Sequence, residues 1–156
     1  MEIKRILWPT DLSGNAEKAI PFVESFAKKY HAEIYVLYVI EELAHHEPWY
    51  GEFDDSHIKK IHEWEEKQAG KRLDQLCEEH LEGCPLYLKE IAIGDPAEEI
   101  LKFIKKRKIN MVVMTTRGRT SRFAFGSVTE RVLKNVTAPV TAVSYTHLTL
   151  PTKRIV

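Results

Sequence analysis

The chain alternates short apolar runs with amphipathic segments, and this alternation most constrains its fold. Runs typical of strands lie at residues 3–8, 33–40, 86–93, 111–114 and 140–143. Patterns with helical periodicity separate them. Strands that alternate with helices predict an α/β domain with a mainly parallel sheet. Right-handed crossovers leave few topologies open.

Each predicted helix has a recognisable start or apolar stripe. Ser13 or Asn15 can cap a helix whose stripe is Ala16, Ala19, Ile20, Val23, Ala27 and Tyr30. Because Pro21 lies inside this pattern, the helix is either kinked there or begins after Asn15. A second helix spans 57–80, with Ile58, Ile61, Leu73, Leu76 and Cys77 facing inward. A third begins at Asp95 as cap and Pro96 as first helical residue, and packs through Ala97, Ile100, Leu101 and Ile104.

The segment 110–139 has the richest pattern. Its strand 111–114 is apolar throughout, as expected for a strand buried on both faces. A polar loop, 115–125, follows and contains Gly118, Arg117, Arg119 and Arg122. Ser127 to Glu130 fits a capping box, and Val128, Val132, Leu133 and Val136 then recur at helical spacing. Strand, arginine loop and helix start suit a phosphate group; the alternative is an ordinary turn with solvated arginines.

This segment resembles the C-terminal signature of the universal stress protein family. In that family a glycine, two residues, a second glycine, nine residues and Gly-Ser or Gly-Thr wrap the phosphates of ATP. Gly118, Gly126 and Ser127 match, as do Arg117, Arg119 and the helix start at 128–133. Two features depart from the signature: Thr115 replaces the first glycine, and seven residues separate Gly118 from Gly126. A side chain at Thr115 obstructs close backbone approach, and the shorter loop wraps less phosphate.

The resemblance implies a doubly wound, open parallel sheet of five strands in the order 3-2-1-4-5, as in adenine-nucleotide α-hydrolase-like proteins. Such sheets bind ligands where the winding reverses, here between strands 1 and 4. By resemblance Asp11 contacts the nucleoside of ATP and Val39 the adenine; the alternatives are an Asx-turn and a core valine. The full set of expected ligand-binding residues, with ATP and its Mg²⁺ as cofactor, is Pro9, Thr10, Asp11, Val39, Thr115, Arg117, Gly118, Arg119, Gly126, Ser127 and Val128.

Composition excludes several classes of function. Lysine plus arginine and aspartate plus glutamate both number 23, so we expect no broad nucleic-acid surface. The apolar run within residues 1–11 is too short for a signal peptide, and no segment in the sequence has membrane-spanning length. The spacing of Cys77 and Cys84 matches no common zinc pair. We therefore expect a cytoplasmic protein that does not bind membranes. Histidines gather at 45, 46, 57, 62 and 80, and we expect them to be solvated rather than metal ligands.

No enzyme motif is present: neither a lysine-bearing phosphate loop nor the metalloprotease or nucleophile-elbow patterns. We therefore expect a nucleotide-binding stress-response regulator with at most slow ATP hydrolysis. The alternatives are a family member that does not bind ATP and acts as a protein-interaction dimer, and a small hydrolase or transferase. The family resemblance implies a homodimer paired through the strand at 140–143, and residues 41–55 could form a lid or a surface for protein partners.

Residues 1–143 are predicted to form one domain. The run 143–152, VSYTHLTLPT, resembles an in-frame translation of a transposase sequencing adapter. Residues 144–156 are therefore expected to be a non-native tail; the alternative is a genuine disordered one.

Overall fold

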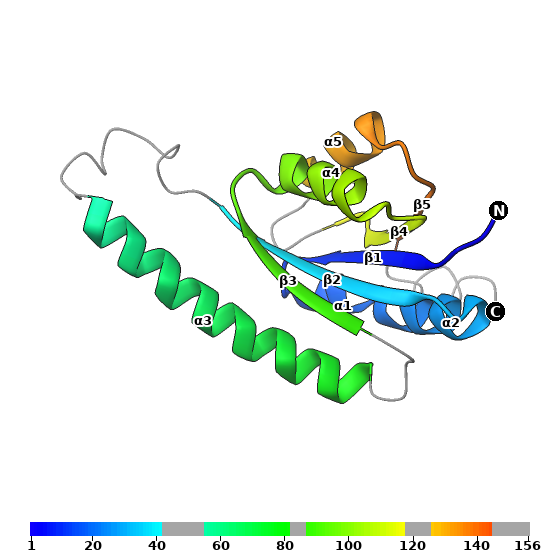
Figure 1. Ribbon diagram of the computed structural model, residues 1–156, viewed down its shortest axis with the longest axis horizontal. Helices are drawn as coiled ribbons and strands as arrows, with labels where there is room; N and C mark the ends of the chain where they lie inside the picture. The colour runs from blue at the N-terminus through cyan, green and yellow to red at the C-terminus, as the bar shows by residue number, and fades with distance from the viewer. Residues whose placement is uncertain (42–54, 82–86, 118–125, 145–156) are drawn as a thin grey trace, which may run out of the picture.

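The computed structural model describes residues 1–41, 55–81, 87–117 and 126–144 (Figure 1). Its centre is one parallel sheet of five strands in the order β3-β2-β1-β4-β5, which confirms the predicted fold. The strands are β1 (Arg5–Thr10), β2 (Glu33–Ile40), β3 (Tyr87–Ile93), β4 (Met111–Thr115) and β5 (Val140–Val143).

Five helices cover the two faces of the sheet. They are α1 (Gly14–Glu17), α2 (Ile20–Tyr30), α3 (Asp55–His80), α4 (Pro96–Arg107) and α5 (Ser127–Asn135). Figure 1 shows α1, α2 and α3 on one side and α4 and α5 on the other. The sheet is therefore doubly wound, and the winding reverses between β1 and β4.

Each face of the sheet has its own apolar core, because successive strand residues point to opposite sides. In β1, Ile6 and Trp8 pack with α2 and α3, whereas Leu7 packs with α4 and α5. All three side chains are completely buried. Burial of a large apolar side chain is worth about 1.5–3 kcal/mol. The central strands therefore hold both helical layers in place.

The first predicted helix is in fact two. Ser13 caps α1, and its hydroxyl accepts from the Ala16 N–H at 3.2 Å. The chain then restarts as α2, in which Pro21 occupies the first turn, where a missing N–H costs nothing. Tyr30 is 40% exposed, so its assignment to the buried stripe was wrong.

The other helical predictions hold in most positions. Asp95 caps α4, accepting from the Glu98 N–H at 3.0 Å, and Gly94 makes the preceding turn with φ +152°. On α3, Leu73, Leu76 and Cys77 are buried as predicted. Ile61 is 36% exposed, so the inward stripe does not extend to the first half of that helix. Among the described residues no helix has the length and apolar character needed to span a membrane.

Candidate functional site

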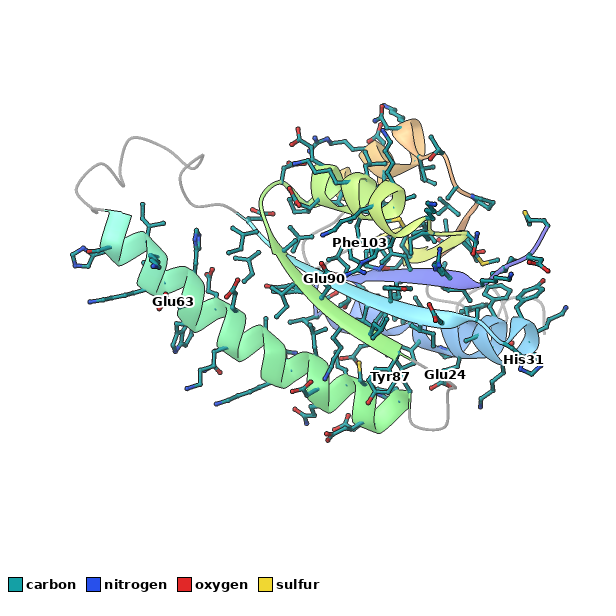
Figure 2. All side chains as sticks on the ribbon, in the orientation of Figure 1. Glu24, His31, Glu63, Tyr87, Glu90 and Phe103 are labelled. Carbon is teal, nitrogen blue, oxygen red and sulfur yellow. The ribbon has the colours of Figure 1, made fainter. Side chains whose placement is uncertain are left out.

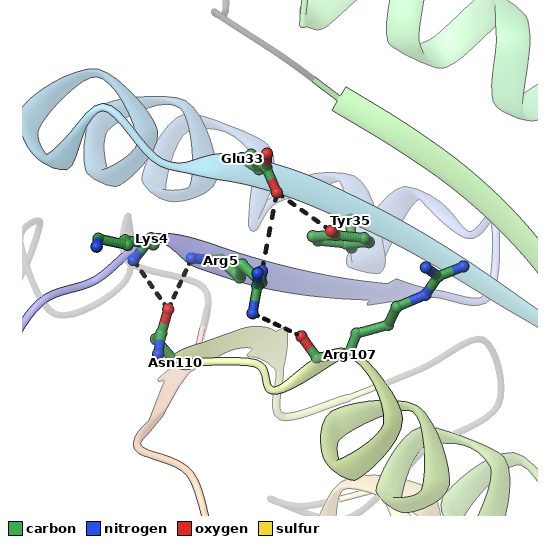
Figure 3. Close-up of polar contacts among 6 residues, drawn as sticks. All are labelled: Lys4, Arg5, Glu33, Tyr35, Arg107 and Asn110. Atoms are coloured by element: carbon green, nitrogen blue, oxygen red, sulfur yellow. Dashed lines mark hydrogen bonds and ion pairs between the residues drawn. The ribbon is translucent and has the colours of Figure 1, made fainter.

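Strands β1 and β4 are joined by hydrogen bonds at the amino end of the sheet and separate toward its carboxyl end, at the point where the winding reverses. At the amino end, Asn110 Oδ1 accepts from the backbone N–H groups of Lys4 and Arg5, both at 2.9 Å (Figure 3). Pairing between β1 and β4 then covers only Ile6–Met111 and Leu7–Val112. Beyond this point β1 continues along β2 and β4 along β5.

Pro9 lies where the two strands part. It belongs to β1, which extends to Thr10; the prediction that Pro9 and Thr10 follow the strand was therefore wrong. Proline has no N–H to donate to a sheet ladder, so it cannot extend the pairing as a donor. We call the region outside the carboxyl ends of β1 and β4 the crevice; it lies at the point where open α/β sheets bind ligands.

The turn after β1 is fixed by its own side chains. The Leu12 N–H donates to Thr10 Oγ1 at 3.0 Å, and the Ser13 N–H donates to Asp11 Oδ1 at 2.9 Å. Leu12 has a φ of 63°, in the left-handed region. The Asx-turn considered for Asp11 is therefore present. It fixes the carboxylate at the carboxyl end of β1.

The segment after β4 is tied to α5. Thr115 Oγ1 donates to the Arg117 carbonyl at 3.0 Å, and Thr129 Oγ1 donates to the Thr115 carbonyl at 2.9 Å. The Gly126 N–H donates to the Thr116 carbonyl, which brings the first residue before α5 against the end of β4. Thr129 is only 4% exposed. These bonds fix the amino end of α5 at the crevice.

The amino end of α5 has no side-chain cap. Gly126 is the N-cap residue and Ser127 the first helical residue, so the predicted capping box at Ser127 was wrong. The Glu130 N–H makes the first helical bond, to the Gly126 carbonyl. Within the described residues, the N–H groups of Ser127, Val128 and Thr129 therefore have no acceptor. Together with the helix dipole they favour an anion.

An ion pair fixes α5 from its other side. Arg131 donates to Asp95 Oδ1 at 2.8 Å, and Asp95 is the cap of α4. The Arg131 guanidinium, followed by the Glu98 N–H, lowers the pKa of the Asp95 carboxyl. Both partners therefore remain charged near neutral pH, and α4 and α5 are joined at their first turns.

Positive charge lies at the carboxyl end of β4, next to β5 and α1. A small cleft there is lined by Asn15, Lys18, Thr115, Thr116, Arg117 and Val143. Within the described residues, Arg117 Nε is buried and has no hydrogen-bond acceptor. A buried guanidinium nitrogen without a partner costs free energy. An anionic ligand beside Arg117 would satisfy this nitrogen.

The structure brings together most of the predicted site. Pro9, Thr10 and Asp11 lie at the end of β1, and Thr115, Arg117, Gly126 and Ser127 lie between β4 and α5. Val39 and Val128 are half-buried against the core beneath α4 and α5, which agrees with the core alternative for Val39. Gly118 and Arg119 lie outside the described residues.

Sequence reasoning missed several residues of this region. Thr129 and the Asp95–Arg131 pair position α5, and Asn15 and Lys18 line the cleft. A threonine in the first turn of an apolar helix was the available signal for Thr129. The contacts of Arg131 and Lys18 depend on tertiary packing, which no local pattern encodes.

Metal binding has no candidate site in the described part of the chain. No group of three His, Cys, Asp or Glu side chains gathers there. His57, His62 and His80 are spread along α3, and His45, His46 and Cys84 lie outside the described residues.

Comparison with known proteins agrees with this architecture. The sequence profile of the universal stress protein family matches residues 2–144. The chain belongs to the universal stress protein family. It is 34% identical to universal stress protein MJ0531 of Methanocaldococcus jannaschii, over 90% of this chain and 81% of that one. It is 30% identical to MJ0577 of the same organism, over 90% of this chain and 94% of that protein.

Solved structures of family members superpose closely. The structure of MJ0577 matches with a TM-score of 0.80 and 27% identity, covering 94% of this chain and 99% of that one. The universal stress protein UspA of Lactobacillus plantarum matches with a TM-score of 0.80 and 25% identity, covering 92% and 99%. The family assignment therefore rests on both sequence and fold.

Proposed function

We propose that this chain binds a nucleotide, ATP with Mg²⁺ in the first instance, in the crevice between the carboxyl ends of β1 and β4. The observation that carries the proposal is the uncapped amino end of α5 at the reversal of the winding, where three N–H groups have no acceptor among the described residues. Helix amino ends in this position are suited to phosphate groups. Arg117, whose Nε has no acceptor among the described residues, adds a cation that can pair with a phosphate oxygen.

In this proposal each side of the crevice contacts a different part of the nucleotide. The phosphates contact α5 and Arg117, while Asp11, fixed by its turn, accepts from hydroxyl groups of the nucleoside. The nucleotide acts as a regulatory ligand: its occupancy changes the surfaces by which the protein pairs with a second copy or a partner. In a homodimer β5, an edge strand of the sheet, is the surface available for pairing with its counterpart.

Two related structures support nucleotides as the ligand class. A universal stress protein was solved in complex with cAMP, and one from Archaeoglobus fulgidus in complex with dAMP. They share 16% and 19% identity with this chain, so their likeness extends to the fold alone. The proposal therefore depends on the chemistry of this chain's own crevice.

Titration calorimetry with Mg-ATP tests the proposal on the full chain. We expect saturable binding, and Arg117→Gln should weaken it about tenfold because one charge-assisted bond to phosphate is lost. Lys134→Gln is the matched control, since Lys134 lies in the last turn of α5 and pairs with Glu130. Equal affinities for the two variants, or no binding by folded protein, would contradict the proposal.

Thr115 favours a second candidate function, a protein-interaction dimer that has lost nucleotide binding. Its side chain occupies the position of the first glycine in the family signature, and its hydroxyl is bonded to the Arg117 carbonyl. Thr115→Gly separates the candidates. If nucleotide binding has been lost, the change should create or strengthen ATP affinity; if the native crevice already binds ATP, the affinity should change little.

A further inference from the structure

A groove separates α3 from the outer edge of β3. Its volume is about 630 Å³, and its walls include Glu63, Glu66, Gly70 and Leu73 of α3 and Lys89 and Ile91 of β3. Figure 2 shows α3 beside β3, with Glu63 on the helix and Glu90 on the strand. From Ala69 onward α3 buries residues in the core, whereas none of the residues 56–68 is buried. The first half of the helix therefore stands away from the sheet and opens the groove.

The strand wall of the groove presents backbone groups that no described residue pairs with. Among the described strands β3 is the edge of the sheet and pairs only with β2. The Gly94 N–H donates to the Ile40 carbonyl, so even-numbered residues of β3 bond to β2, because bonding residues alternate along a parallel strand. The N–H and C=O groups of Lys89 and Ile91 therefore point outward, into the groove. No residue of β3 is buried, so this edge is accessible.

The helix wall leaves negative charge without a partner. Of the carboxylates that line the groove, Asp74 pairs with Lys89, and Glu90 pairs with Arg107 at 3.1 Å. Glu63 and Glu66 have no ion pair within the described residues, and Lys67 is the only lining cation that is not already paired. The open part of the groove is therefore acidic, and its floor between Gly70, Leu73 and Ile91 is apolar.

We propose that this groove binds an extended, basic peptide segment of a partner protein, which adds a strand to the outer edge of β3. The peptide backbone bonds to the outward N–H and C=O groups of Lys89 and Ile91, as in other cases of strand addition to a sheet edge. On its helix-facing side, one aliphatic side chain covers the apolar floor. Lysine or arginine side chains on the same side reach Glu63 and Glu66. This site is separate from the crevice between β1 and β4.

A labelled peptide, acetyl-TVTKTKT-amide, tests the proposal by fluorescence polarisation on the full chain. Its valine and two lysines share one face of an extended strand, and threonine favours that conformation. We expect saturable binding below about 1 mM. A peptide with glutamates in place of the lysines should not bind. Of two peptides N-methylated on alternate residues, only the one whose methyl groups face β3 should lose binding.

Matched variants of the protein locate the peptide. Glu63→Lys with Glu66→Lys should weaken binding about tenfold, whereas Glu78→Lys with Glu79→Lys, the same charge change on the same helix, should leave it unchanged. Gly70→Met should fill the floor and abolish binding. Gly70→Ala should not, because a Cβ at Gly70 lies 3.9 Å from Ile91 Cδ1, an ordinary contact.

Several results would overturn the proposal. They are no saturable binding up to about 1 mM peptide, equal losses in the two charge variants, or equal binding of both N-methylated peptides. Protein dimers that only Glu63→Lys with Glu66→Lys disrupts, without peptide binding, would assign the groove to a second copy of the chain instead. Circular dichroism spectra of all variants confirm that each is folded.

Discussion

Asp95 stabilises two helices with one carboxylate. One oxygen accepts from the Glu98 N–H and caps α4, and the other accepts from Arg131 on α5. Arg131 first, and the Glu98 N–H second, lower the pKa of Asp95 in the folded protein. The stabilisation is therefore complete above the unfolded-state pKa, near 3.8, and is lost as the pH falls through the lowered pKa of the native state.

Two substitutions separate the cap from the ion pair. Asp95→Asn keeps a capping side chain and loses the pair, which is partly exposed, so it should lower the free energy of unfolding by about 0.2–1 kcal/mol at pH 7. Asp95→Ala loses both contacts and should cost about 1–2 kcal/mol. Urea unfolding measures these differences. The gap between wild type and Asp95→Asn should narrow as the pH falls below 3.8 and should close once the pH is below the lowered pKa of native Asp95; a gap that stays constant as the pH falls would contradict the charge argument.

Cys77 is a thiol that the fold protects. It is completely buried on α3, and burial, with a smaller effect of Glu78, raises its pKa to about 11. The thiolate is the reactive form, so both access and ionisation oppose labelling at pH 8. In a Cys84→Ser variant, a disulfide reagent should leave the native protein unlabelled and label one thiol in urea. Rapid labelling of the native variant would show that α3 opens from the sheet.

Elements were predictable where local chemistry decides them. β2 and β5 have the predicted bounds, and α4 has Asp95 as its cap and Pro96 as its first residue, as predicted. These features were predictable because strand periodicity and helix capping depend on residues close together in the sequence. The division of α1 from α2 was only indicated by Pro21. The capping box of α5 was predicted one residue too late: Gly126 is the N-cap, Ser127 is the first helical residue, and no side chain caps the helix.

The two halves of α3 should differ in local stability. Its second half buries Ala69, Leu73, Leu76 and Cys77, whereas Trp64 in the first half is 64% exposed. Helix stability in proteins comes mostly from packing, so the first half should open more easily. Hydrogen exchange followed by mass spectrometry should show faster exchange in residues 56–67 than in 69–80. Uniform protection along the helix would mean that the first half is covered in solution, for example by a second copy.

At the scale of the whole molecule, alternation of strands and helices was enough to predict the α/β class. The strand order was not readable from spacing, since no local pattern says that β1 pairs with both β2 and β4; the family resemblance supplied it. The meeting of Asp11 with the β4–α5 segment follows from that order. The sequence predicted Arg117 as a ligand-binding residue, but it could not show that Arg117 Nε is buried without an acceptor among the described residues, because burial depends on tertiary packing.

The proposed ligand should stabilise the whole domain, because a nucleotide in the crevice joins β1 on one side to β4 and α5 on the other. A ligand that binds only the native state at 100 times its Kd raises the free energy of unfolding by about 2.7 kcal/mol. For a domain of this size, that corresponds to a rise in Tm of roughly 5–10 °C. Differential scanning calorimetry with Mg-ATP measures it.

Two variants test whether the rise in Tm comes from ATP bound in the crevice. At the same ATP concentration, Arg117→Gln should lose about half of the rise in Tm, because tenfold weaker binding lowers the stabilisation from about 2.7 to about 1.4 kcal/mol. Lys134→Gln should keep the rise, because Lys134 lies in the last turn of α5, away from the helix end that faces the crevice. A rise that Lys134→Gln loses and Arg117→Gln keeps would place the nucleotide at the other end of α5. No rise in any of the three proteins would leave the protein-interaction function as the one supported by Thr115.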